Sequence, residues 1–149
     1  MPADVRVFSL NLPSELRMLS VARAFVEAVG QACLLDRRII HALVTASGEA
    51  VTNIIRHAHR HLPTAQLHLE FQVLAETLVL VFQDEGEPFD IAQVPHMDPG
   101  ELRIGGRGVF LMRALMDEVT CEPGIAGRRG NRLRLVKRYG GAGQVRTCG

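Results

Sequence analysis

The longest amphipathic pattern in the chain runs from Asp36 to His61 and predicts one long helix. At about 100° of rotation per residue, its apolar residues fall on one stripe, which we expect to face a core. Glu49 and Asn53 lie one turn apart on roughly the opposite side. This pattern alone fits either a solvated polar face or a binding site. The apolar stripe comprises Ile40, Leu43, Val44, Ser47, Val51, Ile54 and Ala58.

Shorter patterns on both sides of this helix predict further helices and strands. They are a strand at Val5–Leu10, a helix from Ser14 to Val29 that Gly30 ends, a hairpin at Ala65–Leu74 and Leu78–Gln83, a helix at Val109–Met116, and strands at Asp117–Glu122 and Arg132–Arg138. The second strand of the hairpin is apolar on both faces, so we expect it at the centre of a sheet.

These elements predict an α+β fold, a two-layer sandwich in which helices cover one face of a mostly antiparallel mixed sheet. The 149 residues suit one domain, which we place at residues 1–138. Residues 139–149 show no periodicity and are expected to form a disordered tail.

Composition narrows the class of protein. The chain is 47% hydrophobic and 22% charged, which is typical of a globular protein. No apolar run approaches the ~20 residues that span a bilayer, and the N-terminal sequence lacks a signal-peptide pattern. We therefore expect a cytoplasmic protein without membrane association. The three cysteines are widely spaced and indicate neither disulfides nor a zinc site.

The net charge of +1 hides an uneven distribution. Residues 1–100 contain 7 basic and 12 acidic side chains, whereas residues 101–149 contain 10 and 4. A basic C-terminal third suits a phosphate-bearing ligand, an acidic partner or nucleic acid. Because this third has only Phe110 and Tyr139 for base stacking, we do not predict nucleic-acid binding.

Asp84 and Gly86 follow directly after a predicted strand. A carboxylate at a strand end can accept a hydrogen bond from a ligand amine, and a glycine beside it allows the backbone to approach closely. An ordinary β-turn has the same residues, so this motif is not specific alone.

Gly105, Gly106 and Gly108 precede or begin the next predicted helix, with Arg103 and Arg107 beside them. Free backbone amides and the positive end of a helix dipole form an anion site suited to phosphates. The spacing is neither that of a P-loop nor that of a dinucleotide fingerprint. A hinge without a ligand is the alternative.

Four segments in this order carry a resemblance to a known family: EAVTN at 49–53, DEGEPFD at 84–90, GGRGVFLMRALMDEV at 105–119 and NRLRLVKR at 131–138. Together they resemble the anti-sigma-factor serine/threonine kinases, within the GHKL superfamily of histidine-kinase-like ATPases. The resemblance implies an ATP site with Mg²⁺.

The resemblance also implies individual roles. Glu49 corresponds to the general base and Asn53 to the Mg²⁺ ligand, while Asp84 corresponds to the aspartate that binds the adenine amino group. Gly86 lies beside that aspartate. The lid that wraps the triphosphate corresponds to Gly105, Gly106 and Gly108, and either Arg103 or Arg107 is expected to contact the γ-phosphate.

By this resemblance, the chain phosphorylates a serine of a STAS-like anti-anti-sigma protein and sequesters a sigma factor, with a homodimer as the expected assembly. The alternative is a nucleotide-dependent module that binds a partner and transfers no phosphate.

Overall fold

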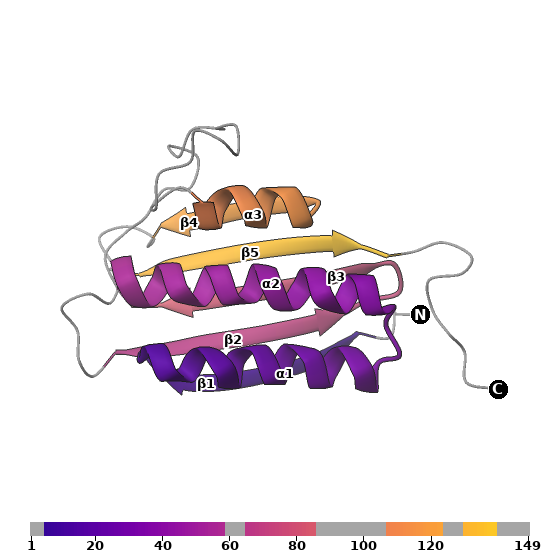
Figure 1. Cartoon of the computed structure of the whole chain (residues 1–149), viewed down its shortest axis with the longest axis horizontal. Helices are drawn as coiled ribbons and strands as arrows, with labels where there is room; N and C mark the ends of the chain where they lie inside the picture. Colours follow the sequence, from indigo (N-terminus) through magenta and orange to yellow (C-terminus); the bar gives the residue numbers. More distant parts are fainter. Residues whose placement is uncertain (1–4, 59–64, 86–106, 124–129, 140–149) are drawn as a thin grey trace.

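The computed structural model describes residues 5–58, 65–85, 107–123 and 130–139 (Figure 1). Its strands are β1 (Arg6–Pro13), β2 (Gln66–Val73), β3 (Thr77–Asp84), β4 (Glu118–Pro123) and β5 (Asn131–Arg138). Its helices are the 3₁₀-helix η1 (Leu16–Met18), α1 (Leu19–Ala32), α2 (Arg37–Asn53), the π-helix η2 (Ile54–Ala58) and α3 (Arg107–Leu115).

The strands form one sheet in the order β1-β2-β3-β5-β4, and each of these neighbouring pairs is antiparallel. Figure 1 shows α1, α2 and α3 on one face of this sheet. The predicted α+β class and two-layer arrangement are confirmed. The prediction that the second hairpin strand is central is also confirmed, because β3 is the third of the five strands.

The main core lies between the sheet and the helices. Side chains alternate across a strand, so every second residue of β2 and β3 faces the helices. The register places Phe8, Phe71, Leu80, Leu135 and Val119 in one row across the five strands on that face. Phe71, Leu80 and Leu135 are fully buried. A smaller cluster of Val79, Val81 and Val136 on the other face explains why β3 is apolar on both sides.

Helix α2 begins as predicted at Asp36, whose Oδ1 accepts a hydrogen bond of 2.8 Å from the Arg38 backbone N–H. Its buried face is wider than the predicted stripe, because α2 packs against both the sheet and its neighbouring helices. Ile40 and Val44, which the sequence places in the stripe, are half-buried. The additional buried residues include Ile39, Ala42, Ala46 and Ala50.

Two predicted helix boundaries are wrong. Gly30 does not end the first helix, which continues to Ala32; a Cβ atom at Gly30 would lie 2.8 Å from Ile40 Cγ1, so the glycine allows α1 and α2 to approach. The helix does not begin at Ser14 either, but at Leu19, after η1. Instead, the Ser14 backbone N–H donates to the Ala65 carbonyl.

The α-helical part of the long amphipathic segment ends at Asn53, and the chain continues as the π-helix η2. Residues 59–61, where we expect the helix to end, lie outside the described residues, as do residues 140–149 of the predicted tail. Tyr139, which the sequence assigns to that tail, is instead 6% exposed within the core. No helix in the described parts of the chain is long and apolar enough to cross a membrane.

Candidate functional site

The first turn of α3 lies directly against Glu49 and Asn53 of α2. A Cβ atom at Gly108 would lie 2.8 Å from Glu49 Oε2, and 3.3 and 3.4 Å from Asn53 Nδ2 and Oδ1. The absence of a side chain at Gly108 therefore lets the N-terminal backbone of α3 approach both polar groups. The carboxylate and carboxamide that the sequence places one turn apart thus meet one helix N-terminus.

This contact has a clear electrostatic character. The first N–H groups of a helix lack partners within the helix, and they lie at the positive end of its dipole. Glu49 and Asn53 are half-buried, whereas Arg107, the first residue of α3, is exposed. The contact combines a carboxylate, an amide oxygen and backbone N–H groups, which are groups that can bind a phosphate and its cation.

Asp84 ends β3 with a buried side chain, 8% exposed. Its Oδ1 accepts a hydrogen bond of 3.1 Å from Nδ2 of Asn131, which is the facing residue on β5 and is 7% exposed. Asn131 is the first residue of the fourth family motif, but the sequence alone indicates no role for it. Pairing the start of the last strand with the end of β3 would have revealed the contact, but that register follows from the tertiary fold.

Gly130 fixes the backbone around Asp84. Its φ is +127°, in a region that side-chain-bearing residues rarely adopt, and a Cβ atom there would lie 2.6 Å from the Asp84 carbonyl oxygen. Both the conformation and the close contact therefore require glycine. The strand entry that carries Asn131 is thereby held against the strand end that carries Asp84.

The π-helix η2 begins directly after Asn53. Hydrogen bonding from i to i+5 changes the rotation per residue, and single π turns within helices are frequent at functional sites. This change could not be predicted from the sequence, because the residues of η2 fit the α-helical apolar period equally well.

Several of the predicted site elements come together. Figure 1 shows the C-terminal end of α2, the N-terminal end of α3, the end of β3 and the start of β5 at the same end of the molecule. The described members of the predicted set are Glu49, Asn53, Asp84, Arg107 and Gly108. Gly86, Arg103, Gly105 and Gly106 lie outside the described residues.

Comparison with known proteins identifies the family. A family model described as the histidine kinase-like ATPase domain matches residues 12–137. The chain belongs to the histidine kinase-like ATPase family. The resemblance found in the sequence is confirmed.

Individual relatives agree with this assignment. The chain is 32% identical over 120 residues to the serine-protein kinase RsbW of Staphylococcus epidermidis, covering 74% of this chain and 76% of that protein. It is 28% identical over 118 residues to the serine-protein kinase RsbW of Oceanobacillus iheyensis, covering 74% and 75%.

A solved structure shares the fold. It contains the RsbU and RsbW domains of Rv1364c from Mycobacterium tuberculosis, with a TM-score of 0.60 and 16% sequence identity. The match covers 89% of this chain and 32% of the Mycobacterium tuberculosis chain, so this chain spans about a third of that protein.

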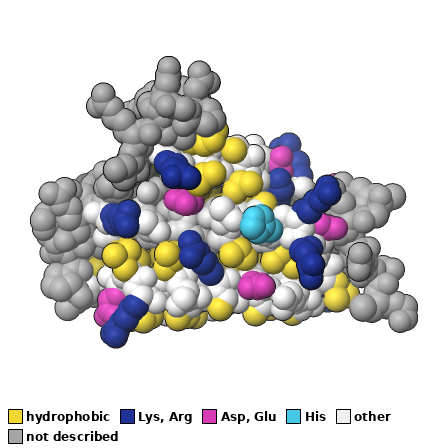
Figure 2. All heavy atoms as spheres, in the orientation of Figure 1, with side chains coloured by type: hydrophobic (Ala, Val, Ile, Leu, Met, Phe, Trp, Pro, Cys, Tyr) yellow, Lys and Arg dark blue, Asp and Glu magenta, His cyan; other side chains and the backbone are white. Residues whose placement is uncertain are grey.

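The helical layer of this histidine kinase-like ATPase domain is basic. Its described helices contain seven arginines and two glutamates. Figure 2 shows Lys and Arg side chains spread over the helix-covered face. Positive charge is therefore not confined to the C-terminal third, because arginines from the N-terminal helices also lie on this face. A positively charged face favours the approach of anions.

Proposed function

We propose that this chain binds ATP with Mg²⁺ at the end of the molecule where α2, α3 and β3 meet, and transfers the γ-phosphoryl group to a serine of a partner protein. The observation that carries the proposal is the contact of the α3 N-terminus with Glu49 and Asn53. The relatives named as serine-protein kinases support the choice of acceptor.

The donor set fits the proposed nucleotide. Among the described residues, no group of three or more His, Cys, Asp or Glu side chains could hold a metal ion. Mg²⁺ commonly binds proteins through one or two side-chain oxygens and takes its other ligands from phosphate and water. The Asn53 amide oxygen suits this role, and the buried Asp84 carboxylate suits an adenine amino group. The predicted contributions of Gly86, Gly105 and Gly106, and of Arg103 or Arg107 at the γ-phosphate, belong to the same proposal.

In the proposed reaction, the serine oxygen forms a bond to phosphorus as the bond to the ADP oxygen breaks. ATP supplies the phosphoryl group, and Mg²⁺ bound with it would offset its charge. Glu49 orients the serine hydroxyl and accepts its proton. The α3 N-terminus and Arg107 offer N–H donors to the phosphate oxygens, and Asp84, held by Asn131, orients the base.

By likeness to the same relatives, we propose a STAS-like anti-anti-sigma protein as the phosphate acceptor and a sigma factor as the sequestered partner. An anti-sigma role requires that phosphorylation of the antagonist changes which partner the chain holds. We also propose that the chain acts as a homodimer.

The test is transfer of labelled phosphate from ATP with Mg²⁺ to candidate STAS-like proteins, using wild type and Glu49→Gln. Glu49→Gln keeps the shape of the side chain and removes the base, so transfer should fall by about 10²–10⁴-fold while nucleotide affinity is retained. Tight nucleotide binding without transfer to any antagonist would refute the kinase proposal. Equal nucleotide-dependent partner release in both proteins would instead support a binding module without transfer.

A further inference from the structure

Arg23 of α1 lies on the backbone of α2 directly before Glu49. A Cβ atom at Gly48 would lie 2.7 Å from Arg23 Nε, 2.9 Å from Nη2 and 3.2 Å from Cζ. Gly48 is buried and Arg23 is exposed. The absence of a side chain at Gly48 therefore lets the guanidinium lie against α2 while it stays accessible from solvent, one residue from the proposed general base.

The order of groups around α2 separates Arg23 from the proposed nucleotide. Successive residues of an α-helix are rotated by about 100°, so Glu49 is about 100° from Gly48 and Asn53 is about 40° further in the same direction. The N-terminus of α3 approaches Glu49 and Asn53. Glu49 therefore lies between Arg23 on one side and the α3 N-terminus on the other. A phosphate bound at α3 would reach Glu49 from the side away from Arg23.

Arg23 has no ion-pair partner in the parts of the chain that the structure describes. Within the same parts, Arg56 is likewise unpaired, and it is exposed in η2 just beyond Asn53. A guanidinium presents its N–H donors in a planar fork that matches a carboxylate. This end of the helical layer can therefore hold a carboxylate that another molecule brings.

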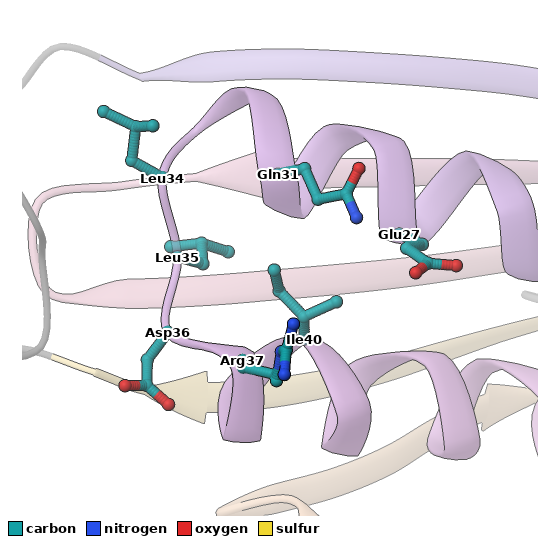
Figure 3. A pocket seen from close by; sticks show the side chains of 7 residues that line it. All are labelled: Glu27, Gln31, Leu34, Leu35, Asp36, Arg37 and Ile40. Atoms are coloured by element: carbon teal, nitrogen blue, oxygen red, sulfur yellow. The ribbon is translucent and has the colours of Figure 1, made fainter. Parts of the chain in front are cut away.

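Charges at the opposite end of α2 balance one another. A cavity of about 660 Å³ lies there, beside the connection from α1 to α2 (Figure 3). Its lining contains the carboxylates of Glu27 and Asp36 and the guanidinium of Arg37, and the exposed Arg38 is next along the chain. Figure 3 shows Glu27 on α1 and Arg37 on α2, on two sides of the cavity. An excess of positive charge is therefore a feature of the Glu49 end of this helix pair.

We propose that Arg23 binds a carboxylate of the phosphate-accepting protein and thereby holds its serine beside Glu49. This contact rests on the proposed kinase function and adds the chemistry of the acceptor, which must carry an aspartate or glutamate close to the serine. Complementary charge speeds the encounter of two proteins and fixes their orientation. A protein carboxylate fits better than a nucleic-acid phosphate, because the same molecule must supply the hydroxyl that Glu49 orients.

Kinetics with a STAS-like protein that the wild type phosphorylates test this role. Arg23→Gln removes the charge and should raise the KM for the acceptor about tenfold, as expected for loss of one charge-assisted hydrogen bond. The kcat and the KM for ATP should be unchanged. Arg23→Lys keeps the charge without the planar fork, so its acceptor KM should fall between those of wild type and Arg23→Gln.

Arg37→Gln is the matched control. It removes the same charge from an exposed arginine of the same helical layer, about 18 Å along α2 from Glu49. The acceptor KM should be unchanged in this variant. Equal effects of the two glutamine substitutions would show diffuse attraction in place of a contact, and a raised KM for ATP in Arg23→Gln would place Arg23 at the nucleotide. Either result would overturn the proposal.

A binding measurement does not require phosphoryl transfer. Two serine peptides of equal length, one with aspartates and the other with asparagines around the serine, are titrated into the full chain with ADP and Mg²⁺. The NMR resonance of the Arg23 Nε–Hε group, assigned with Arg23→Lys, reports the contact. We expect the aspartate peptide to shift this resonance more than that of Arg37, and the asparagine peptide to shift neither.

Failure of the contact and failure of the kinase have different signatures. Shifts at Arg23 without transfer to any acceptor would refute the kinase proposal and support the acidic contact. Transfer with an unchanged acceptor KM in Arg23→Gln would refute the contact alone. Equal shifts from both peptides, or a larger Arg23 shift from a single-stranded oligonucleotide of the same charge, would also refute it.

Discussion

Two neighbours of α2 approach it through a glycine, with different consequences. On α1, Gly30 lies against the apolar Ile40 side chain, at 2.8 Å from a hypothetical Cβ to Cγ1. On α3, Gly108 lies equally close to the Glu49 carboxylate and next to the Asn53 amide. The first contact brings two apolar surfaces together. The second brings a polar helix end to two polar side chains.

The difference separates packing from function along one helix. At Gly30, the close approach buries apolar surface, so its effect belongs in the free energy of unfolding. At Gly108, the close approach places a carboxylate and an amide beside the first N–H groups of α3, and we propose that this arrangement binds and orients a ligand. Substitutions at the two glycines should therefore change different measurements.

Of the substitutions that test this difference between the two glycines, Gly108→Ala is expected to have the largest effect on activity. The new Cβ would displace the Glu49 carboxylate, and we expect phosphoryl transfer to fall by at least about tenfold, or about 1.4 kcal/mol in activation free energy. The free energy of unfolding should change by less than about 1 kcal/mol, because alanine favours the helix and the displaced side chain is half-buried. Transfer assays and urea unfolding of the same preparation measure both. A large loss of stability with normal activity per folded molecule would show that Gly108, like Gly30, serves packing.

Asn131→Ala tests the buried pair of Asp84 and Asn131, which lies at the same end of the molecule as Glu49 and Asn53. It removes the buried hydrogen bond to Asp84, an interaction with a charged group worth about 1.5–3 kcal/mol. We expect ATP affinity to fall about tenfold and the preference for ATP over GTP to narrow, because the Asp84 carboxylate that we propose to bind the adenine base would be less well oriented. Nucleotide titrations measure both values. A purely structural role would lower stability and leave the preference unchanged.

Gly30→Ala should lower the free energy of unfolding by about 1–2 kcal/mol, since overpacking against Ile40 exceeds the gain in helix propensity. Gly48→Ala is the matched control, because a Cβ there would meet the Arg23 side chain at 2.7 Å, and Arg23 is exposed and can move. The control should be neutral or more stable by up to about 1 kcal/mol. Urea unfolding distinguishes the two, and equal destabilisation by both would show that Gly30 has no special packing role.

The local parts of this structure could be predicted from the sequence. Alternation predicts the strands, and the Asp36 cap and the helical spacing of Glu49 and Asn53 depend on neighbouring residues alone. The family motifs add Asp84 and Gly108 to the same site. These features need no knowledge of which elements pack together.

The missed features all depend on tertiary contacts. Gly30 resembles a helix stop until Ile40 is placed beside it, and Asn131 has no evident role until β5 pairs with β3. Leu34 adopts a conformation that the sequence would assign to glycine. The same argument applies to Tyr139, whose burial follows from its place in the main core cluster and not from any periodicity.

Substitution of Tyr139, which packs in the apolar core, should give the smallest effect, and on the free energy of unfolding only. Burial, with a smaller contribution from the neighbouring Cys33, raises the pKa of its phenol above the ordinary 10.0, and its hydroxyl donates a hydrogen bond to the Leu74 carbonyl. The folded state therefore holds the phenol proton more tightly than the unfolded state, and this difference stabilises the protein. The stabilisation is fully present below pH 10. It is lost as the pH rises through the folded-state pKa.

Tyr139→Phe should lower the free energy of unfolding by about 0.5–1.5 kcal/mol at neutral pH through loss of the hydrogen bond. Between the two pKa values, the wild-type advantage should shrink by at most about 1.4 kcal/mol per pH unit, since one proton is involved. Urea unfolding from pH 8 to 11 measures the difference between the two proteins, in which titration of the other groups cancels. A difference in unfolding free energy that stays constant across this range would contradict the raised pKa. As a control, phosphoryl transfer at pH 8 should be equal in both proteins, because Tyr139 lies outside the proposed site at Glu49 and Asn53.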